Sequence, residues 1–246
     1  MPISPNFTSI YRRSFQIDFF DCSPDGHIKL SSLSRLIQYV ASEHAVEGGI
    51  SFWDMQPTNQ AWVVNKFRIE IEEKELPKWQ DDIDIVTWIE KLDGFRSIRN
   101  FEVYMGDVLI ANASSMWVII NTVKRRPELM ALPHDHFIKY PDKHTIKNNF
   151  QIPPKTPLLK IDDNRVRYSD LDMVNHVTNI KYIDWIMDSA YAKGIDLQHC
   201  RTIDMLFKKE MTYGQNFDVS YGQDEQGHHF TIQTDEKTTN FYCFFS

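Results

Sequence analysis

The fold is decided by a segment that occurs twice, as FFDCSPDGHIKLSSLSRLIQYVASEHA at Phe19–Ala45 and as RYSDLDMVNHVTNIKYIDWIMDSAYAKG at Arg167–Gly194. Aligning His27 with His176 also aligns an aspartate six residues earlier and a branched apolar residue directly after. Self-similarity of this kind indicates a duplicated structural unit.

Both copies continue into a helical pattern, because apolar residues recur there at the spacing of one helix face. The residues at this spacing are Leu33, Leu36, Ile37, Val40, Ala41 and the polar His44 in the first copy, and Ile180, Ile183, Ile186, Met187, Ala190 and Tyr191 in the second.

Stretches rich in Val, Ile, Trp and Phe follow each helical pattern and predict strands. The predicted strands are Ala61–Ile71, Ile83–Lys91, Arg96–Met105 and Val108–Asn121, then Ile203–Lys208, Asn216–Gln223, His228–Glu236 and Thr239–Phe245. One long helix followed by antiparallel strands in each half is an α+β pattern. Strand and helix do not alternate, which argues against a parallel nucleotide-binding sheet.

A linker is predicted at Arg125–Lys160, where six prolines disfavour regular helix. We place the boundary near Asn149, which gives an N-terminal half with the linker, 1–149, and a C-terminal half, 150–246. Some apolar residues of the linker are expected to pack: Leu129, Met130, Leu132 and Phe137.

The composition, 42% hydrophobic and 25% charged residues, is that of a globular protein. A net charge of −7 argues against nucleic-acid binding, which relies on a basic field. No apolar run approaches the ~18 residues of a membrane span, and Met1–Arg13 does not resemble a secretory signal. Three scattered cysteines, Cys22, Cys200 and Cys243, suit a reducing compartment, so a cytoplasmic protein is expected. No residue cluster implies a metal or an organic cofactor.

The segment SDLDMVNHVTNIKYIDW, Ser169–Trp185, resembles the active-site segment of plant and bacterial acyl-ACP thioesterases. Further matches to this family are AWVVNKFRIEIEEKELPKW (Ala61–Trp79), SSMWVIINTVKRRP (Ser114–Pro127) and FKKE (Phe207–Glu210). The resemblance implies two tandem hot-dog folds, each a long helix wrapped by an antiparallel sheet, which form a pseudo-dimer. It also implies hydrolysis of fatty acyl-ACP, with release of the fatty acid and an end to chain elongation.

Two residues depart from the family pattern. Plant members usually carry Asn two residues before the histidine, where this chain has Val174, and often carry Cys directly after the late glutamate, where it has Met211. Because a thioether has no ionisable proton, Met211 excludes a cysteine nucleophile at that position.

The resemblance places the site in the second half, at Asp172, His176 and Glu210. Glu210 would activate water or attack directly, while His176 orients the carboxylate or the substrate and Asp172 holds the network or shares the base role. Backbone N–H groups near Asn175–Thr178 are expected as oxyanion donors, and the Asn175 side chain as a further one. The preceding carboxylate, Asp170, is expected to be only a cap.

The first half repeats the histidine as His27 but has Leu76 at the position equivalent to Glu210. It is therefore expected to shape the acyl pocket rather than to catalyse. Candidate lining residues are Trp62, Val64, Phe67, Phe101 and Trp117.

Three other functions fit parts of the pattern: a hot-dog hydrolase of acyl-CoA, a non-catalytic acyl-binding regulatory module, and a dehydratase. Val174 and Met211 keep the regulatory module open, whereas the polar trio argues against it. An acyl carrier protein is the expected partner, with Lys124–Arg126 and Lys208–Lys209 as possible contacts, and either a monomer or a homodimer is compatible with two hot-dog folds in one chain.

Overall fold

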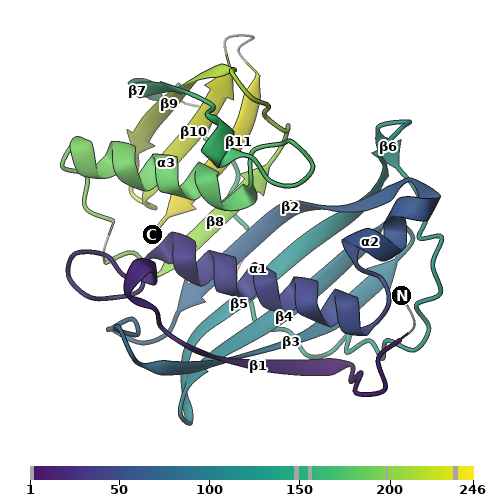
Figure 1. The fold of residues 1–246 in the computed structure, drawn as a ribbon. Coiled ribbons are helices and arrows are strands. Elements are labelled where there is room, and N and C mark those ends of the chain that lie inside the picture. The colour runs from purple at the N-terminus through teal and green to yellow at the C-terminus, as the bar shows by residue number, and fades with distance from the viewer. Residues whose placement is uncertain (1–2, 147–149, 155–156, 198, 235–237) are drawn as a thin grey trace. The chain divides into compact units, whose positions relative to one another are not determined.

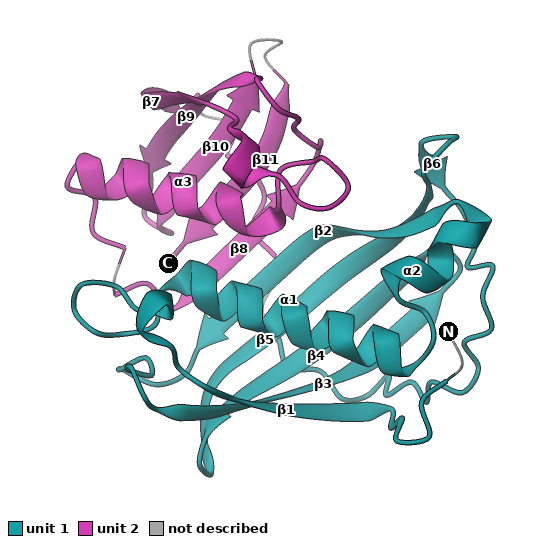
Figure 2. Cartoon of the chain, viewed as in Figure 1, with its two compact units in different colours: residues 1–147 teal, residues 148–246 magenta. Residues whose placement is uncertain are grey.

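The computed structural model describes the whole chain except residues 1–2, 147–149, 155–156, 198 and 235–237. The chain divides into two compact units, Met1–Lys147 and Asn148–Ser246, coloured separately in Figure 2. The boundary predicted near Asn149 lies outside the described residues. No helix within the described ranges is both long and apolar enough to cross a membrane.

Unit 1 is a single antiparallel sheet with one long helix lying across it (Figure 1). Its elements are β1 (Ile10–Gln16), η1 (Phe19–Asp21), α1 (Leu30–Glu47), α2 (Phe52–Met55), η2 (Gln56–Thr58), β2 (Gln60–Ile71), β3 (Asp82–Asp93), β4 (Arg96–Met105), β5 (Val108–Asn121) and β6 (Arg126–Pro127). The strand order is β1-β3-β4-β5-β2, and the short β6 pairs with β5.

Unit 2 repeats this plan on a smaller scale. Its elements are β7 (Leu159–Arg165), η3 (Tyr168–Asp170), α3 (Asn179–Ala192), β8 (Thr202–Phe207), β9 (Asn216–Gln223), β10 (His228–Thr234) and β11 (Thr239–Phe245). The strand order is β7-β9-β10-β11-β8, which is the order of unit 1 with each strand replaced by its counterpart. The duplication seen in the sequence is therefore a duplication of topology, and the α+β prediction is confirmed.

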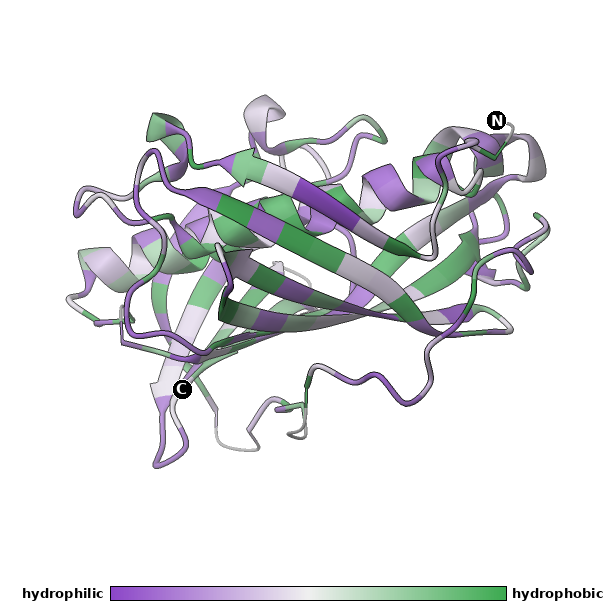
Figure 3. Ribbon diagram, turned by 90° about the horizontal axis from the view of Figure 1, so that it is seen from below, coloured by the Kyte–Doolittle hydropathy of each residue, from purple (hydrophilic) through white to green (hydrophobic). Residues whose placement is uncertain are grey.

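The two long helices bury the faces that their apolar spacing predicts. In α1 all six predicted residues are buried, including Leu33 and Ile37, which are fully inaccessible. In α3 the prediction is wrong for Tyr191, which is 87% exposed, and the buried aromatic residues are instead Tyr182 and Trp185. Hydrophobic and hydrophilic residues are interspersed along several strands in Figure 3, as expected for sheets with one face against a helix, whereas β11 is buried along almost its whole length.

The linker is held to unit 1 by an aromatic anchor. Phe137 is 1% exposed and packs with Ile50 and Ile89, and Met130 and Leu132 pack against the same cluster. The expectation fails for Leu129, which is 67% exposed. The linker segment is therefore packed at its centre although it contains little regular structure.

Candidate active site

The loop between η3 and α3 is closed by its own backbone. The N–H of Asp172 donates to the carbonyl of His176 (2.8 Å), and the N–H of Asn175 donates to the carbonyl of Asp172 (3.1 Å). Leu171 and Val177 pair as an isolated antiparallel bridge across the base of the loop. The loop therefore presents His176 from a fixed backbone, three residues before α3 begins.

Asp172 organises this loop with its carboxylate. Its Oδ1 accepts from the N–H of Val174 (2.9 Å) and from the N–H of His176 (3.2 Å). Its neighbour Asp170 does not cap the long helix α3, whose N-cap is Thr178, but closes the short η3 by accepting from the N–H of Arg167 (2.7 Å). Both aspartates thus bind backbone N–H groups, and the geometry favours a positioning role for Asp172.

A pair of Asp172 variants separates positioning from chemistry. Asp172→Asn keeps an oxygen that accepts from the same two N–H groups, so it is expected to retain most of the activity. Asp172→Ala removes both bonds and is expected to lower kcat about tenfold, because it releases the loop that holds His176. Steady-state hydrolysis checks this, and an equal loss in both variants would instead indicate that the Asp172 charge takes part in the reaction.

His176 and Glu210 form the pair that the resemblance implied. His176 Nε2 lies 3.4 Å from Glu210 Oε2, and each side chain is 28% exposed, so the pair is sheltered yet open to water. The segment after β8 carries Glu210 and is clamped on two sides: the N–H groups of Lys208 and Lys209 donate to the carbonyl of Asn240. The carbonyl of Met211 accepts from the N–H of Val177 (2.8 Å), which ties this segment to the His176 loop.

Tyr182 is a polar residue of the site that the sequence analysis missed. It is 3% exposed, and burial raises the pKa of its phenol, a shift to which the charges of Glu210 and Asp172 also contribute. A backbone hydrogen bond with Met211 opposes that shift. Tyr182 is therefore a neutral phenol close to both carboxylates. The available signal was its place on the buried face of α3, one turn into the helix.

The expected oxyanion donors are engaged elsewhere, so that prediction is wrong for the backbone of residues 175–178. The N–H groups of Asn175 and His176 bond to Asp172, that of Val177 to Met211, and that of Thr178 to the carbonyl of Asp170 (2.9 Å). Because α3 begins only at Asn179, the backbone N–H groups that have no acceptor within the helix lie in its first turn. Thr178 does not cap that turn with its side chain.

Asn175 adopts a left-handed backbone conformation, with φ of 65°. Its counterpart in unit 1 is Gly26, with φ of 85°, whose N–H closes the equivalent turn onto the carbonyl of Ser23 (2.9 Å). Asparagine and glycine are the residues that tolerate this conformation best. The conformation accounts for Asn175 without any donor role for its side chain.

Asn175→Gly is accordingly expected to leave kcat almost unchanged, because glycine tolerates the turn. Asn175→Ala is expected to lower the free energy of unfolding by about 1 kcal/mol, because its Cβ disfavours a positive φ. Denaturant titration and steady-state kinetics on the two variants check both points. A large loss of kcat in Asn175→Gly would restore the side chain as an oxyanion donor.

The equivalent loop of unit 1 shows which features are general. The N–H of Ile28 donates to the carbonyl of Pro77 (2.8 Å), the bond that Val177 makes to Met211 in unit 2, and this places Leu76 where unit 2 has Glu210. The alignment of His27 with His176 makes Leu33 of α1 the counterpart of Tyr182 in α3. Unit 1 thus keeps the loop and a histidine but has leucine at both remaining polar positions.

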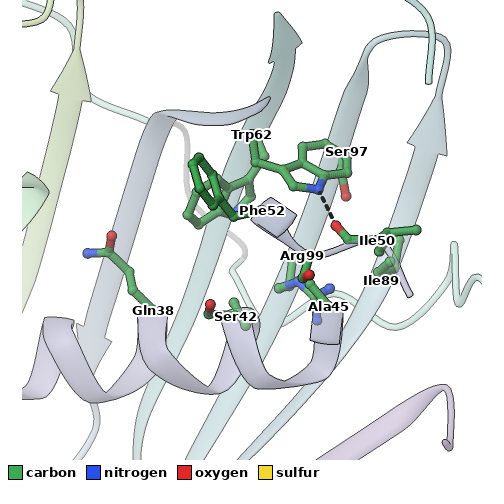
Figure 4. Close-up of a pocket in the computed structure, with 12 residues that line it drawn as sticks. Gln38, Ser42, Ala45, Ile50, Phe52, Trp62, Ile89, Ser97 and Arg99 are labelled. Atoms are coloured by element: carbon green, nitrogen blue, oxygen red, sulfur yellow. Dashed lines mark hydrogen bonds between the residues drawn. The ribbon is translucent and has the colours of Figure 1, made fainter. Parts of the chain in front are cut away.

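Unit 1 instead contains a cavity of about 190 Å³ between α1 and the sheet (Figure 4). Of the predicted lining residues, Trp62 and Trp117 do line it. Val64, Phe67 and Phe101 do not; they are at most 2% exposed and belong to the core.

A long helix wrapped by an antiparallel sheet, present twice in one chain, is a tandem hot-dog fold. Residues 8–136 match the acyl-ACP thioesterase N-terminal domain family, and residues 158–242 match the acyl-ACP thioesterase C-terminal domain family. Because the two matches follow in order over most of its length, this chain belongs to the acyl-ACP thioesterase family.

Relatives of this family resemble the chain in sequence and in fold. The palmitoyl-acyl carrier protein thioesterase of Arabidopsis thaliana, a chloroplastic protein, is 25% identical over an alignment of 219 positions, and the match covers 82% of this chain and 52% of the relative. The chain thus spans about half the length of the curated relatives it matches. An acyl-ACP thioesterase from Bacteroides thetaiotaomicron superposes with a TM-score of 0.85 at 22% identity, covering 96% of this chain and 97% of the other. The 12:0-ACP thioesterase from Umbellularia californica superposes with a TM-score of 0.81 at 19% identity, covering 97% of each chain.

Proposed function

We propose that this chain hydrolyses the thioester of fatty acyl-ACP and releases the free fatty acid, which ends chain elongation. The observation that carries this proposal is the His176–Glu210 pair, 3.4 Å apart, on a fixed loop of the unit that matches the family's C-terminal domain. Unit 1 has no counterpart of Glu210 and supplies the acyl pocket.

The proposed reaction uses the carboxylate of Glu210. As a base, it takes a proton from a water molecule whose oxygen attacks the thioester carbon, and the carbon–sulfur bond breaks as the pantetheine sulfur leaves and takes up a proton. His176 holds the carboxylate through Nε2. The developing oxyanion faces the first turn of α3, where the N–H of Ile180 has no intrahelical acceptor.

The three cysteines give no support to a thiolate mechanism. Burial raises the pKa of each thiol, both in the partly exposed Cys22 and Cys200 and in the buried Cys243; for Cys200 the pKa rises to about 11. A raised pKa lowers the thiolate fraction at neutral pH, and the thiolate is the nucleophile. A carboxylate therefore remains the group that fits the chemistry.

An acidic carrier protein would meet exposed positive charge beside the site. Lys208 and Lys209 are both exposed and directly precede Glu210 along the chain. Such charges steer an oppositely charged partner toward the site against the net negative charge of the whole chain. The Lys124–Arg126 cluster is also exposed, although Lys124 pairs with Glu128 (3.1 Å).

The test is steady-state hydrolysis of matched acyl-ACP and acyl-CoA substrates by the wild-type chain, with the Glu210→Ala and His176→Ala variants as inactive controls. Rapid release of fatty acid from acyl-ACP, lost in both variants while their melting temperatures hold, is the expected result. A strong preference for acyl-CoA would refute the carrier assignment and leave the chemistry. Tight acyl binding without turnover on either substrate would favour the regulatory module instead.

A further inference from the structure

The cavity of unit 1 has an apolar wall with one charged residue in it. Apolar side chains such as Ile50, Ile89 and Trp117 make up most of the lining. Arg99, on β4, also lines the cavity although it is only 5% exposed, and Figure 4 shows it beside Ala45 of α1, close to Ile50 and Ile89. A cationic side chain in an apolar acyl pocket calls for a physical explanation, because burying a charge is costly.

The guanidinium is only partly satisfied by the protein. Its Nη1 donates to His44 Nδ1 (2.7 Å) and to Thr87 Oγ1 (3.2 Å). No carboxylate pairs with Arg99 in the part of the chain that the structure describes, and Nε and Nη2 have no hydrogen-bond partner there. Burial lowers the pKa of Arg99 to about 10, so the group still carries its charge at neutral pH.

His44 does not compensate this charge. Its Nε2 bonds to the carbonyl of Thr8 (2.9 Å) and its Nδ1 accepts from Arg99, which defines a neutral ring. The ring is stacked between Phe7 and Tyr11, at centroid distances of 5.5 and 5.6 Å. Arg99 is thus held from one side by neutral groups, and its remaining donors are left for whatever enters the cavity.

A plain saturated chain would leave those donors without partners, because it would displace water from them and offer no acceptor in return. An oxygen on the chain would accept from them, and a hydrogen bond to a charged donor is among the stronger ones in proteins. Ser97 lines the same cavity two residues earlier on β4, on the same face of the strand, and adds a hydroxyl.

We propose that this cavity selects acyl chains that carry an oxygen function, a hydroxyl or a carboxylate, which accepts hydrogen bonds from Arg99. This assignment rests on the acyl-thioester function proposed above and narrows its substrate class.

Equilibrium binding tests this without any turnover. The probes are amide analogues of acyl-pantetheine, in which NH replaces the thioester sulfur, with a plain chain, with a hydroxyl moved carbon by carbon, or with a terminal carboxylate. At least one oxygenated analogue is expected to bind about tenfold more tightly than the plain chain of equal length, the factor that corresponds to about 1.4 kcal/mol. The hydroxyl and carboxylate series distinguish a neutral from an anionic acceptor, and a gain in either supports the proposal.

Three variants attribute the preference to Arg99. Arg99→Met is expected to abolish the preference for oxygenated analogues. Arg99→Lys keeps the charge and is expected to reduce the preference; it is included because Arg99→Met can fold poorly. The matched control is Arg68→Met, which removes another buried arginine of unit 1 (4% exposed, 3.4 Å from Glu70) that does not line the cavity, and the preference should persist.

Equal binding of plain and oxygenated analogues would overturn the proposal, as would a preference that survives in Arg99→Met. Because these measurements need no hydrolysis, a chain that binds oxygenated analogues selectively but turns over no thioester would refute only the proposed catalytic function.

Discussion

Replacing Glu210 by glutamine is expected to lower kcat for acyl-ACP hydrolysis by about 10²–10⁴-fold, the usual contribution of a positioned general base. Glutamine has the same shape and can still face His176 Nε2, but an amide can neither take a proton from water nor attack the thioester. The melting temperature should hold, because Glu210 is partly exposed and its segment is fixed by backbone bonds to Asn240 and Val177. Rapid-quench and steady-state assays measure the loss.

The duplicated topology supplies a matched control. Leu76→Gln places the same amide at the equivalent position of unit 1, directly before the Pro77 carbonyl that accepts from Ile28 as Met211 accepts from Val177, and is expected to leave kcat unchanged. If Glu210→Gln kept most of its activity, the base would have to be another carboxylate, and Asp172 would be the first to examine. If both variants lost activity equally, the assignment of catalysis to unit 2 would be wrong.

Most of the fold could be predicted because its central strands are strongly apolar. Apart from the two-residue β6, the strands that were not predicted are β1 and β7, which lie at sheet edges and have mostly exposed side chains. Their sequences, IYRRSFQ and LKIDDNR, are polar, as suits an edge that must not pair with another chain. Apolar alternation is therefore weak in both, and the strands become visible only through their pairing with β3 and β9.

The site was predictable only in part, since its members come from distant parts of the chain. The approach of His176 to Glu210 could be predicted only from the resemblance of their segments to the family's motifs, because sheet topology and not local spacing brings the two residues together. The turn role of Asn175 depends on a positive φ, for which Gly26 in the aligned copy was the one sequence signal. The N–H groups of Asn175, Val177 and Thr178 bond to backbone carbonyls, and these partners left no trace in the sequence because they do not depend on side-chain identity. The N–H of His176 bonds instead to the carboxylate of Asp172.

His44 is expected to make the stability of the protein fall steeply in acid. Burial, reinforced by the charge of Arg99, lowers the pKa of His44 to about 3, whereas the unfolded chain has an ordinary histidine pKa of about 6.5. Between these values the unfolded state binds the proton and the folded state does not, so falling pH favours unfolding. The contribution of the neutral His44 to the free energy of unfolding is complete above pH ~6.5. Below that pH it is lost at a rate approaching about 1.4 kcal/mol per pH unit.

The groups around His44 allow the pH dependence of stability to be assigned to its imidazole ring. Its neighbours are Arg99, which stays charged throughout, the aromatic rings of Phe7, Tyr11 and Phe137, and the carbonyl of Thr8. Among the described residues, no carboxylate hydrogen-bonds to the ring or contributes to its pKa shift. His44→Gln can still accept from Arg99 with Oε1 and donate to Thr8 with Nε2, but it does not titrate. Urea titrations at a series of pH values should therefore show a slope below pH 6.5 that is steeper in the wild type than in His44→Gln, and parallel curves above it. Parallel curves over the whole range would mean that the ring accepts a proton inside the fold. The assignment of a neutral His44 beside an uncompensated Arg99 in the cavity wall would then be wrong as well.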